Sequence, residues 1–401
     1  MRYYIIAGEA SGDLHASNLI RGLRAEDPEA DIRGWGGDLM REAGAEIVRH
    51  YKDTAIMGFL TVLKNLGKIK ANIRLCCEDI RSWKPDVVIL VDYAGFNLRI
   101  ARFAKGIGLK VFYYISPKLW AWNTGRVKKI KRYVDRMYTI FPFETDFYGR
   151  YHYTVEYGGN PLVDAIDARP YREETFAGFI KANDLPDKPI IALLAGSRSQ
   201  ELRYVLPAML RMVDHFPDYQ FVIAGAPSMS DADYAPYLKG REVRILYGQT
   251  YRLLSQAKAA LVTSGTATLE TALLRIPQVV CYNGEGGRLS YYLFKTFVKV
   301  DYISLVNLIF GGEVVKELMM HRLTERNILN ELSRILYSER DREKMLRNYD
   351  EVIRRLGQPG ASVRFAKMMV QDAKNIHQLG ESSLSFFRRN FWHQNPETDI
   401  S

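Results

Sequence analysis

The segment Ala259–Asn283, AALVTSGTATLETALLRIPQVVCYN, decides how the rest of the chain is interpreted. Its apolar run Ala259–Val262 predicts a buried strand, and Ala267–Leu274 is rich in residues that favour a helix. Pro277 ends this helix before a second apolar run, Gln278–Tyr282. Strand, turn, helix and strand in this order predict one right-handed βαβ unit of a parallel sheet.

The turn of this unit carries residues suited to a nucleotide. Ser264, Gly265 and Thr266 stand where the helix begins, and the free N–H groups and dipole of a helix N-terminus favour an anion such as phosphate. Glu270 lies one turn further on, where a carboxylate can accept both hydroxyl hydrogens of a ribose. A capped scaffold helix with an exposed glutamate is the alternative interpretation.

Length and composition indicate a globular protein of two domains. The chain has 401 residues, of which 47% are hydrophobic and 25% charged. Its three cysteines are too few for a disulfide framework, and their spacing does not suggest zinc. The sequence MRYYIIAGEA opens on a strand rather than a secretory signal, and the apolar runs are too short to span a bilayer. We therefore expect a soluble or peripheral protein.

The formal net charge of +10 calls for an acidic partner. An anionic membrane surface, an acidic substrate and a nucleic acid would each suit this charge. No RNA-recognition, zinc-finger or basic-zipper signature is present, so we expect no nucleic acid.

The first half of the chain alternates strands with helical patterns. Apolar strands are predicted at Tyr3–Ala7, Ile32–Gly37, Lys84–Tyr93, Lys110–Ile115 and Arg136–Ile140. The glycine turn at residues 8–13, before a helix at 14–25, lacks the GxGxxG spacing of nicotinamide-binding proteins. This alternation predicts a doubly wound α/β domain with helices on both faces of its sheet.

A second βα series follows the junction Gly158–Pro161. Its predicted strands are Pro189–Leu194, Tyr219–Ala224, Val243–Tyr247 and Ala259–Val262, and the chain is helical and charged from Leu323. We expect two Rossmann-like domains facing each other across a cleft, at residues 1–160 and 161–345, followed by C-terminal helices and a tail at 346–401.

Five stretches, spread in order over the first 320 residues, resemble the lipid-A-disaccharide synthase family. They are AGEASGD (Ala7–Asp13), ISPKLWAW (Ile115–Trp122), LAGSRSQEL (Leu194–Leu202), SGTATLE (Ser264–Glu270) and VKVDYISLVNLI (Val298–Ile309). The resemblance implies a GT-B glycosyltransferase that needs no cofactor. Such an enzyme moves 2,3-diacylglucosamine from UDP to 2,3-diacylglucosamine 1-phosphate, forming a β-1,6 bond with inversion.

The resemblance also implies roles for particular residues. Asp92 is the candidate base, Arg198 the contact to the donor diphosphate, and Glu270 and Asn307 belong to the UDP site. The predicted donor site is completed by Gly196, Ser197, Ser264, Gly265 and Thr266. The family usually has a second acid where Gly95 stands, a histidine where Asn160 stands, and LPGSR where this chain has LAGSR.

Each of these roles has a structural alternative. Asp92 closes the run VVILVD and could instead cap the next helix, and Arg198 could pair with Glu201. His15 and Asp13 are rival bases. The predicted acceptor side of the cleft is formed by Glu9, Ser11, Gly12, Asp13, His15, Asn97, Trp120 and Trp122. The tryptophans could equally fill the core.

The pair Asp231 and Asp233 matches the DxD pattern that can hold a divalent metal beside a diphosphate. It follows a polar loop before a predicted helix, which favours helix capping. Arginine and helix dipoles can do the work of such a metal, and the resemblance implies that none is needed.

Met57–Leu75 has apolar residues at helical spacing with lysines among them. Such a basic amphipathic helix can rest on an anionic membrane and admit acyl chains, or can simply face the core. The residues predicted to contact membrane or acyl chains are Met57, Phe59, Leu60, Leu63, Lys64 and Lys68. We expect a cytoplasmic protein, peripheral on the inner face of the inner membrane. A homodimer and the role of the tail at 381–401 are left open.

Two other functions remain open at this point. One is another UDP-GlcNAc-type enzyme on the same fold, either a lipid-linked GlcNAc transferase or a 2-epimerase. The other is a non-catalytic nucleotide-sugar-binding membrane protein, which would bind UDP without cleaving a sugar donor.

Overall fold

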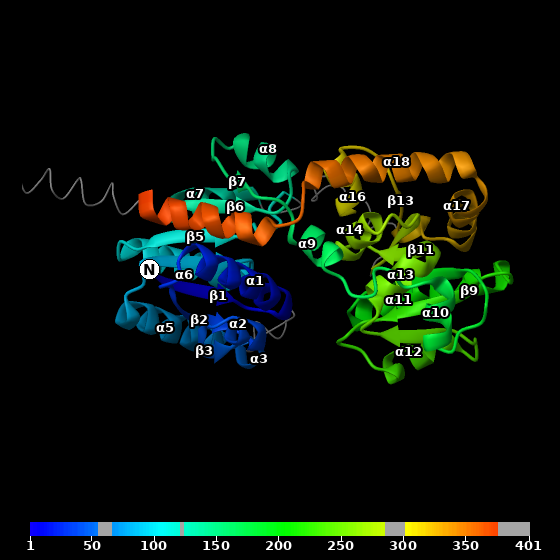
Figure 1. Ribbon diagram of the computed structural model, residues 1–401, viewed down its shortest axis with the longest axis horizontal. Helices are drawn as coiled ribbons and strands as arrows, with labels where there is room; N and C mark the ends of the chain where they lie inside the picture. The colour runs from blue at the N-terminus through cyan, green and yellow to red at the C-terminus, as the bar shows by residue number, and fades with distance from the viewer. Residues whose placement is uncertain (55–65, 121–123, 285–300, 376–401) are drawn as a thin grey trace, which may run out of the picture.

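The computed structural model describes residues 1–54, 66–120, 124–284 and 301–375, and it has two α/β domains side by side (Figure 1). Within the described residues, the first domain has a parallel sheet in the order β3-β2-β1-β4-β5-β6-β7. Its strands are β1 (Arg2–Ala7), β2 (Asp31–Gly36), β3 (Glu46–His50), β4 (Val87–Val91), β5 (Lys110–Tyr114), β6 (Arg136–Thr139) and β7 (Glu156–Tyr157). Its helices are α1 (Ala10–Glu26), α2 (Asp38–Glu42), α3 (Tyr51–Thr54), α5 (Leu66–Trp83), α6 (Ala94–Gly106), η1 (Thr124–Arg126), α7 (Val127–Tyr133) and α8 (Phe143–Gly149).

The second domain repeats this topology, with the sheet order β10-β9-β8-β11-β12-β13. Its strands are β8 (Ile190–Leu194), β9 (Gln220–Gly225), β10 (Arg244–Tyr247), β11 (Ala257–Thr263), β12 (Gln278–Tyr282) and β13 (Lys316–Met319). The helices from the junction onward are α9 (Pro161–Asp167), α10 (Phe176–Ala182), α11 (Ser199–Leu210), η2 (Arg211–His215), α12 (Asp231–Leu238), α13 (Thr250–Gln256), α14 (Thr266–Leu273), α16 (Leu305–Phe310), η3 (Met320–Arg322), α17 (Glu325–Tyr337) and α18 (Glu339–Leu356). The predicted pair of doubly wound domains is therefore confirmed.

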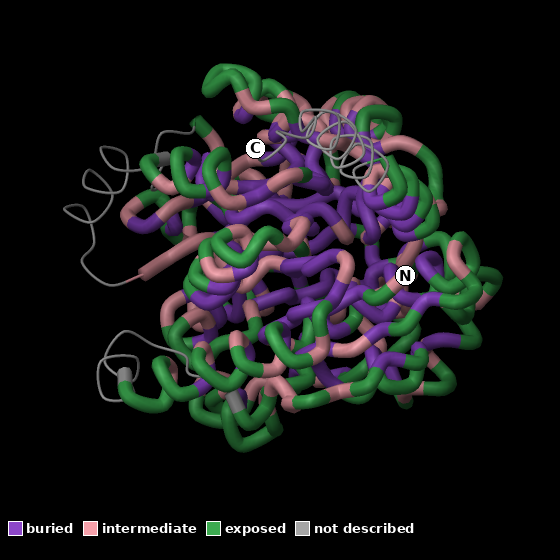
Figure 2. Tube along the Cα trace, turned by 90° about the vertical axis from the view of Figure 1, so that its left-hand side faces the viewer, coloured by how far each residue is buried: buried purple, intermediate pink, exposed green. Residues whose placement is uncertain are grey.

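The apolar runs of the sequence form the strands at the centre of each sheet because helices cover both faces. In β1, Tyr3 and Ile5 pack on one face with α1, whereas Tyr4 and Ile6 pack on the other with α5 and α6. Alternate residues thus enter separate cores, and the strand is apolar throughout. Buried residues accordingly occupy the interior, and exposed ones lie mainly on the outside (Figure 2).

The strands that the sequence analysis missed lie away from these central positions. β3 and β13 form outer edges of the two sheets, and β7 is the last strand of the first sheet. Their residues are mostly half-buried or exposed, so they lack the continuous apolar run by which the inner strands were predicted. A second difference concerns α1, which begins at Ala10 and so takes in most of the predicted glycine turn.

The chain crosses between the domains twice, at Gly158–Asn160 and at Gly357–Gly360. After α18, which covers the second domain, a helix at 361–375 returns to the sheet of the first domain (Figure 1). The expected division at residue 345 falls inside α18. Among the described residues, no helix is both long and apolar enough to cross a membrane.

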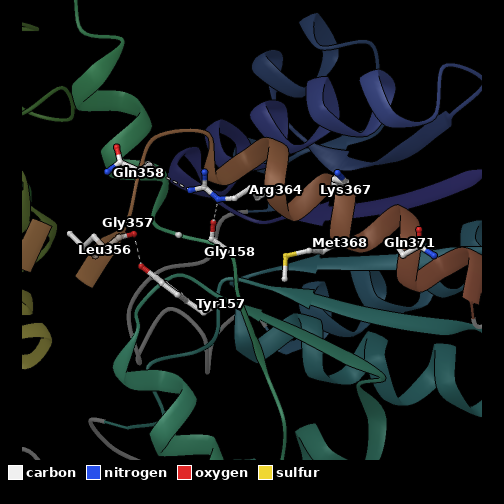
Figure 3. A pocket seen from close by; sticks show the side chains of 10 residues that line it. Tyr157, Gly158, Leu356, Gly357, Gln358, Arg364, Lys367, Met368 and Gln371 are labelled. Atoms are coloured by element: carbon white, nitrogen blue, oxygen red, sulfur yellow. Dashed lines mark hydrogen bonds between the residues drawn. The ribbon is translucent and has the colours of Figure 1, made fainter. Parts of the chain in front are cut away.

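Arg364 joins the two crossings. Its guanidinium donates to the carbonyl oxygen of Gly158 at 2.8 Å and to those of Gln358 and Pro359 at 2.6 and 2.7 Å (Figure 3). The Tyr157 hydroxyl adds a bond to the Leu356 carbonyl oxygen at 2.8 Å. A cavity of about 680 Å³ lies beside these contacts (Figure 3). Arg364 and Tyr157 therefore link the two crossings through backbone carbonyl groups.

Candidate functional site

The two sheets reverse their strand order between β1 and β4 and between β8 and β11. At such switch points the loops after the two strands diverge, which leaves a crevice at the carboxyl edge of the sheet. Most of the predicted site residues follow these four strands. A pocket of about 420 Å³ lies at the second switch point, and Lys118 of the first domain lines it together with residues of the second. The pocket thus lies between the domains.

The turn between β11 and α14 provides one wall of this pocket, as the sequence predicted. Ser264, Gly265 and Thr266 line it, and α14 begins at Thr266. Gly265 has a φ of +148°, a conformation that side chains rarely adopt, so glycine is required at this position. The buried Thr263 hydroxyl also reaches the pocket and has no hydrogen-bond partner among the described residues. It can donate to a ligand oxygen.

The opposite wall is the turn between β8 and α11. Gly196, at a φ of +106°, leaves room for the Glu201 carboxylate, which accepts from the backbone N–H groups of Ser197 and Arg198 at 2.7 and 3.2 Å. Glu201 therefore caps α11 through the backbone. Arg198 lines the pocket, and its guanidinium has no ion pair within the described part of the chain. The alternative of a pair with Glu201 is not what the structure has.

Glu270 lies where this pocket meets a second one, of about 330 Å³. The second pocket is lined by Pro170, Tyr171, Gly248, Gln249, Thr250, Tyr251, Arg252 and Glu270. Burial raises the pKa of the Glu270 carboxyl, and a hydrogen bond from the Tyr251 hydroxyl at 2.9 Å opposes this rise. The Glu270 carboxylate thus lies at the border between the pocket at the β11–α14 turn and the adjoining pocket.

Asp92 follows β4 in a strained backbone conformation. Asp92 and Tyr93 have φ angles of +44° and +45°, which are rare for residues other than glycine. α6 begins after Tyr93 without a side-chain cap, so Asp92 does not serve as the cap considered above. Burial and then the charge of Glu9 raise the pKa of Asp92 to about 6, while Lys118 and the Tyr93 N–H oppose them. A group with this pKa can take up a proton near neutral pH.

Asn97 and Tyr113 hold the backbone at this point. The Asn97 amide donates to the carbonyl oxygens of Val91 and Asp92 at 3.1 and 2.8 Å, and the Tyr113 hydroxyl also donates to that of Asp92. Asn97 is fully buried. It was expected to face the acceptor, and instead it positions Asp92.

The residues of the glycine turn after β1 have two kinds of role, at the cleft edge and in support of the fold. Glu9 accepts a hydrogen bond from Ser11 at 2.7 Å and acts electrostatically on both Asp92 and His15. Burial lowers the pKa of His15, so its ring is held neutral. Gly12 packs on β1 at Ala7. Glu9 and His15 thus share the cleft edge with Asp92.

Asp13 is the exception within this turn. Its buried carboxylate accepts from the backbone N–H groups of Gly37, Leu39 and Met40 at 2.7, 3.2 and 3.2 Å, at the start of α2. Removing it would leave those groups without their acceptor. Asp13 therefore anchors α2 rather than standing free as a base.

Asn307 likewise supports the site from behind. Its side chain is fully buried, donates to Val315 and Glu317, and accepts from the N–H groups of Val314 and Val315. This uses the amide completely, so the expected contact to UDP is not made by its side chain. Glu317, which accepts from the Asn307 amide, also accepts from the N–H groups of Ile303 and Ser304 at 3.0 and 2.9 Å. The Ile303 carbonyl oxygen in turn accepts from the Ser264 hydroxyl at 3.3 Å. Asn307 thus acts on the pocket through Ser264.

The remaining predicted residues lie in the core, on the surface of α5 or in the ranges that the structure does not describe. Trp120 packs edge to face on Phe143 and is 8% exposed, so it belongs to the core. Lys68 is exposed on α5. Trp122, Met57, Phe59, Leu60, Leu63 and Lys64 lie outside the described residues.

The Asp231 and Asp233 pair serves a structural purpose, as the sequence indicated. Asp233 accepts from the backbone N–H and hydroxyl of Ser230, both at 2.8 Å, at the start of α12. Asp231 accepts from the Tyr247 hydroxyl at 2.9 Å. Both carboxylates are therefore engaged away from the pocket.

Comparison with known proteins gives a consistent family. The model of the "Lipid-A-disaccharide synthetase" family matches residues 3–371. Lipid-A-disaccharide synthase from Geobacter metallireducens is 38% identical over 376 residues, covering 92% of this chain and 97% of that protein. Those from Myxococcus xanthus and Coxiella burnetii are 36% and 34% identical, over 92% and 91% of this chain and 97% and 96% of theirs.

Solved structures share the fold at low sequence identity. A UDP-GlcNAc 2-epimerase from Neisseria meningitidis, bound to UDP-GlcNAc, has a TM-score of 0.67 at 13% identity and covers 92% of this chain and 100% of that one. A calicheamicin glycosyltransferase has a TM-score of 0.57 at 15% identity, over 94% and 98% of the two chains. These likenesses identify the GT-B fold. The family model and the close relatives go further, and show that this chain belongs to the lipid-A-disaccharide synthase family.

Proposed function

We propose that this chain condenses UDP-2,3-diacylglucosamine with 2,3-diacylglucosamine 1-phosphate in the cleft between its domains. The products are the β-1,6 disaccharide 1-phosphate and UDP. The observation that carries the site assignment is the position of Glu270, which borders both the pocket lined by Arg198 and the pocket lined by Tyr251.

A UDP donor fits these two pockets in one orientation. The diphosphate would lie against Arg198 and the start of α14, where a guanidinium and free N–H groups stabilise negative charge. The ribose would then reach Glu270, which can accept from its hydroxyls, and the uracil would enter the pocket beside Tyr171 and Tyr251. Family membership supports a sugar nucleotide as donor, and the two adjoining pockets support this orientation.

The transfer step follows from the two sides of the cleft. The 6-hydroxyl oxygen of the acceptor forms a bond to the anomeric carbon of the donor, while the bond from that carbon to the diphosphate oxygen breaks. The Asp92 carboxylate takes the hydroxyl proton, and the electron pair of the broken bond stays on UDP. Arg198 stabilises the charge that develops on the departing diphosphate.

We also propose that the first domain rests on an anionic membrane through the region that ends in α5. This helix exposes Lys68 and Lys70, and Leu75 on the same helix is 49% exposed. Arg74 is also exposed but is paired with Glu78 at 2.8 Å. Basic side chains near an exposed apolar one suit a surface of anionic headgroups and acyl chains. This supports a peripheral position on the cytoplasmic face of the inner membrane, where both lipid substrates are accessible.

The function is tested by incubating the purified protein with UDP-diacylglucosamine, with and without diacylglucosamine 1-phosphate. We expect disaccharide and UDP only when both substrates are present. Conversion of the donor that does not depend on the acceptor would indicate an epimerase or a hydrolase. Binding of UDP with no turnover of the donor would indicate a non-catalytic protein. Either result would refute the proposed reaction.

A further inference from the structure

Lys118 stands out because it belongs to the first domain and yet lines the donor pocket of the second. The other residues around that pocket run from Leu194 to Glu270, all in the second domain. The side chain of Lys118 is exposed, while Pro117 and Leu119 on either side are buried. The sequence therefore places one cation between two buried neighbours and directs it across the cleft.

The backbone before Lys118 is firmly held. Ile115, the first residue after β5, has a φ of +65°, which is a strained conformation for a β-branched residue. Its N–H donates to the Tyr138 carbonyl oxygen at 3.0 Å, and the buried hydroxyls of Ser116 and Tyr148 are 2.6 Å apart. Strain of this kind persists only where the surroundings impose it, and it occurs here at the edge that presents Lys118.

The charges around Lys118 differ on its two sides. Toward the second domain it shares the pocket with Arg198, so two cations border the space assigned to the diphosphate. Toward its own domain it acts on Asp92, near which Glu9, Tyr93 and Tyr113 also lie. Glu9 raises the pKa of Asp92, and Lys118 lowers it. Lys118 thus borders the space assigned to the leaving group and also acts electrostatically on the proposed base.

We propose that Lys118 is a second catalytic cation, which binds the donor diphosphate from the acceptor domain. The inference rests on the proposed function and adds a residue to it. In the transfer step the ammonium group of Lys118 hydrogen-bonds the diphosphate oxygen that receives the electron pair, and no proton needs to move from it. The donor site is then complete only when both domains contribute.

The test compares UDP with UMP, because UMP keeps the uridine contacts and lacks the second phosphate. In Lys118→Met we expect the Kd of UDP to rise about tenfold, with that of UMP changed less than threefold. We expect kcat/KM for the donor to fall 10²- to 10³-fold. The acid limb of the pH profile should move to higher pH, because Asp92 loses the charge that favours its carboxylate. Lys118→Arg should restore most of the UDP affinity.

The control is Lys128→Met, which removes an exposed lysine from α7 of the same domain and should change none of these quantities. Unchanged UDP affinity, donor kinetics and pH profile in Lys118→Met would overturn the assignment. So would an equal loss of UDP and UMP binding, because that would indicate a general disturbance of the donor site. Failure of the function itself is distinct, since the wild-type protein would then form no disaccharide.

Discussion

Replacing Asp92 by asparagine tests whether Asp92 acts as the catalytic base or has a structural role. The substitution keeps the size of the side chain and an oxygen that can accept from the Tyr93 N–H, and it removes the basic carboxylate. Asparagine also tolerates a left-handed backbone well, so the φ of +44° is no obstacle. If Asp92 takes the acceptor proton, disaccharide formation should fall ~10²- to 10⁴-fold.

The same substitution that lowers activity should raise the stability of the folded protein at high pH. Burial raises the pKa of Asp92 from 3.8 to about 6, so between these values the folded protein holds a proton that the unfolded chain has lost. Stability of the wild-type protein therefore decreases as pH rises through this range. At 1.36 kcal/mol per pKa unit, the ionised carboxylate costs ~2–3 kcal/mol at pH 8. Asp92→Asn should thus be more stable than wild type at pH 8, and equally stable at pH 4.

The assay measures disaccharide formation and the free energy of unfolding at both pH values. Asp187→Asn, which removes an exposed carboxylate from the second domain, should leave both quantities unchanged. Loss of activity together with loss of stability at pH 8 would assign Asp92 a structural role. Retention of most of the turnover would refute the base assignment, and His15 at the same edge would be the next residue to test.

Three further predictions concern the donor site, the crossings and the membrane. Glu270→Ala should raise the donor KM about 10- to 100-fold, because hydrogen bonds to a charged group contribute ~1.5–3 kcal/mol. Tyr251→Phe, which removes only the bond that orients Glu270, should raise the donor KM less than tenfold. Equal KM values in the wild-type protein and both variants would contradict the ribose contact. Arg364→Ala removes hydrogen bonds to three carbonyl groups at the crossings and should lower the free energy of unfolding by ~2–4 kcal/mol in denaturant titrations. Arg364→Lys should recover only part of this free energy. An unchanged denaturation midpoint in Arg364→Ala would show that the crossings do not need the arginine. Exchanging Lys68 and Lys70 for glutamate should reduce sedimentation with anionic liposomes. The binding free energy should fall by ~1 kcal/mol for each lysine removed, and by less at high salt. Wild-type protein that never sediments would exclude this membrane contact.

The inner part of the fold could be predicted from the sequence because burial leaves a direct signal there. Ile190–Leu194 is apolar at every position, since both faces of the strand are covered. The edge strand Glu46–His50 has only half-buried and exposed residues, so its sequence resembles a loop. Its place in the sheet is determined by pairing with β2, a long-range contact that local patterns do not contain.

The site could be predicted where a residue type is required by the backbone. Gly196 and Gly265 have φ angles that other residues rarely adopt, so their presence in the sequence indicated the turns correctly. Asp13 and Asn307 are polar residues in equally suggestive stretches, and yet their side chains satisfy buried backbone groups. A sequence does not distinguish a polar side chain that meets a ligand from one that meets the main chain, because both uses require the same donors and acceptors.

Lys118 escaped the sequence analysis for a related reason. It stands in a stretch whose apolar residues were predicted to matter, and its charge has meaning only once the second domain lies opposite. The same holds for the strain at the edge of the first sheet. Asp92, Tyr93 and Ile115 follow the neighbouring strands β4 and β5, and all three have positive φ angles. Each such residue costs ~1–3 kcal/mol, and together they aim the proposed base and the proposed cation into the same cleft. A fold that needed only to close its sheet could turn here with glycine at less cost, so the strain itself favours a functional role for this edge.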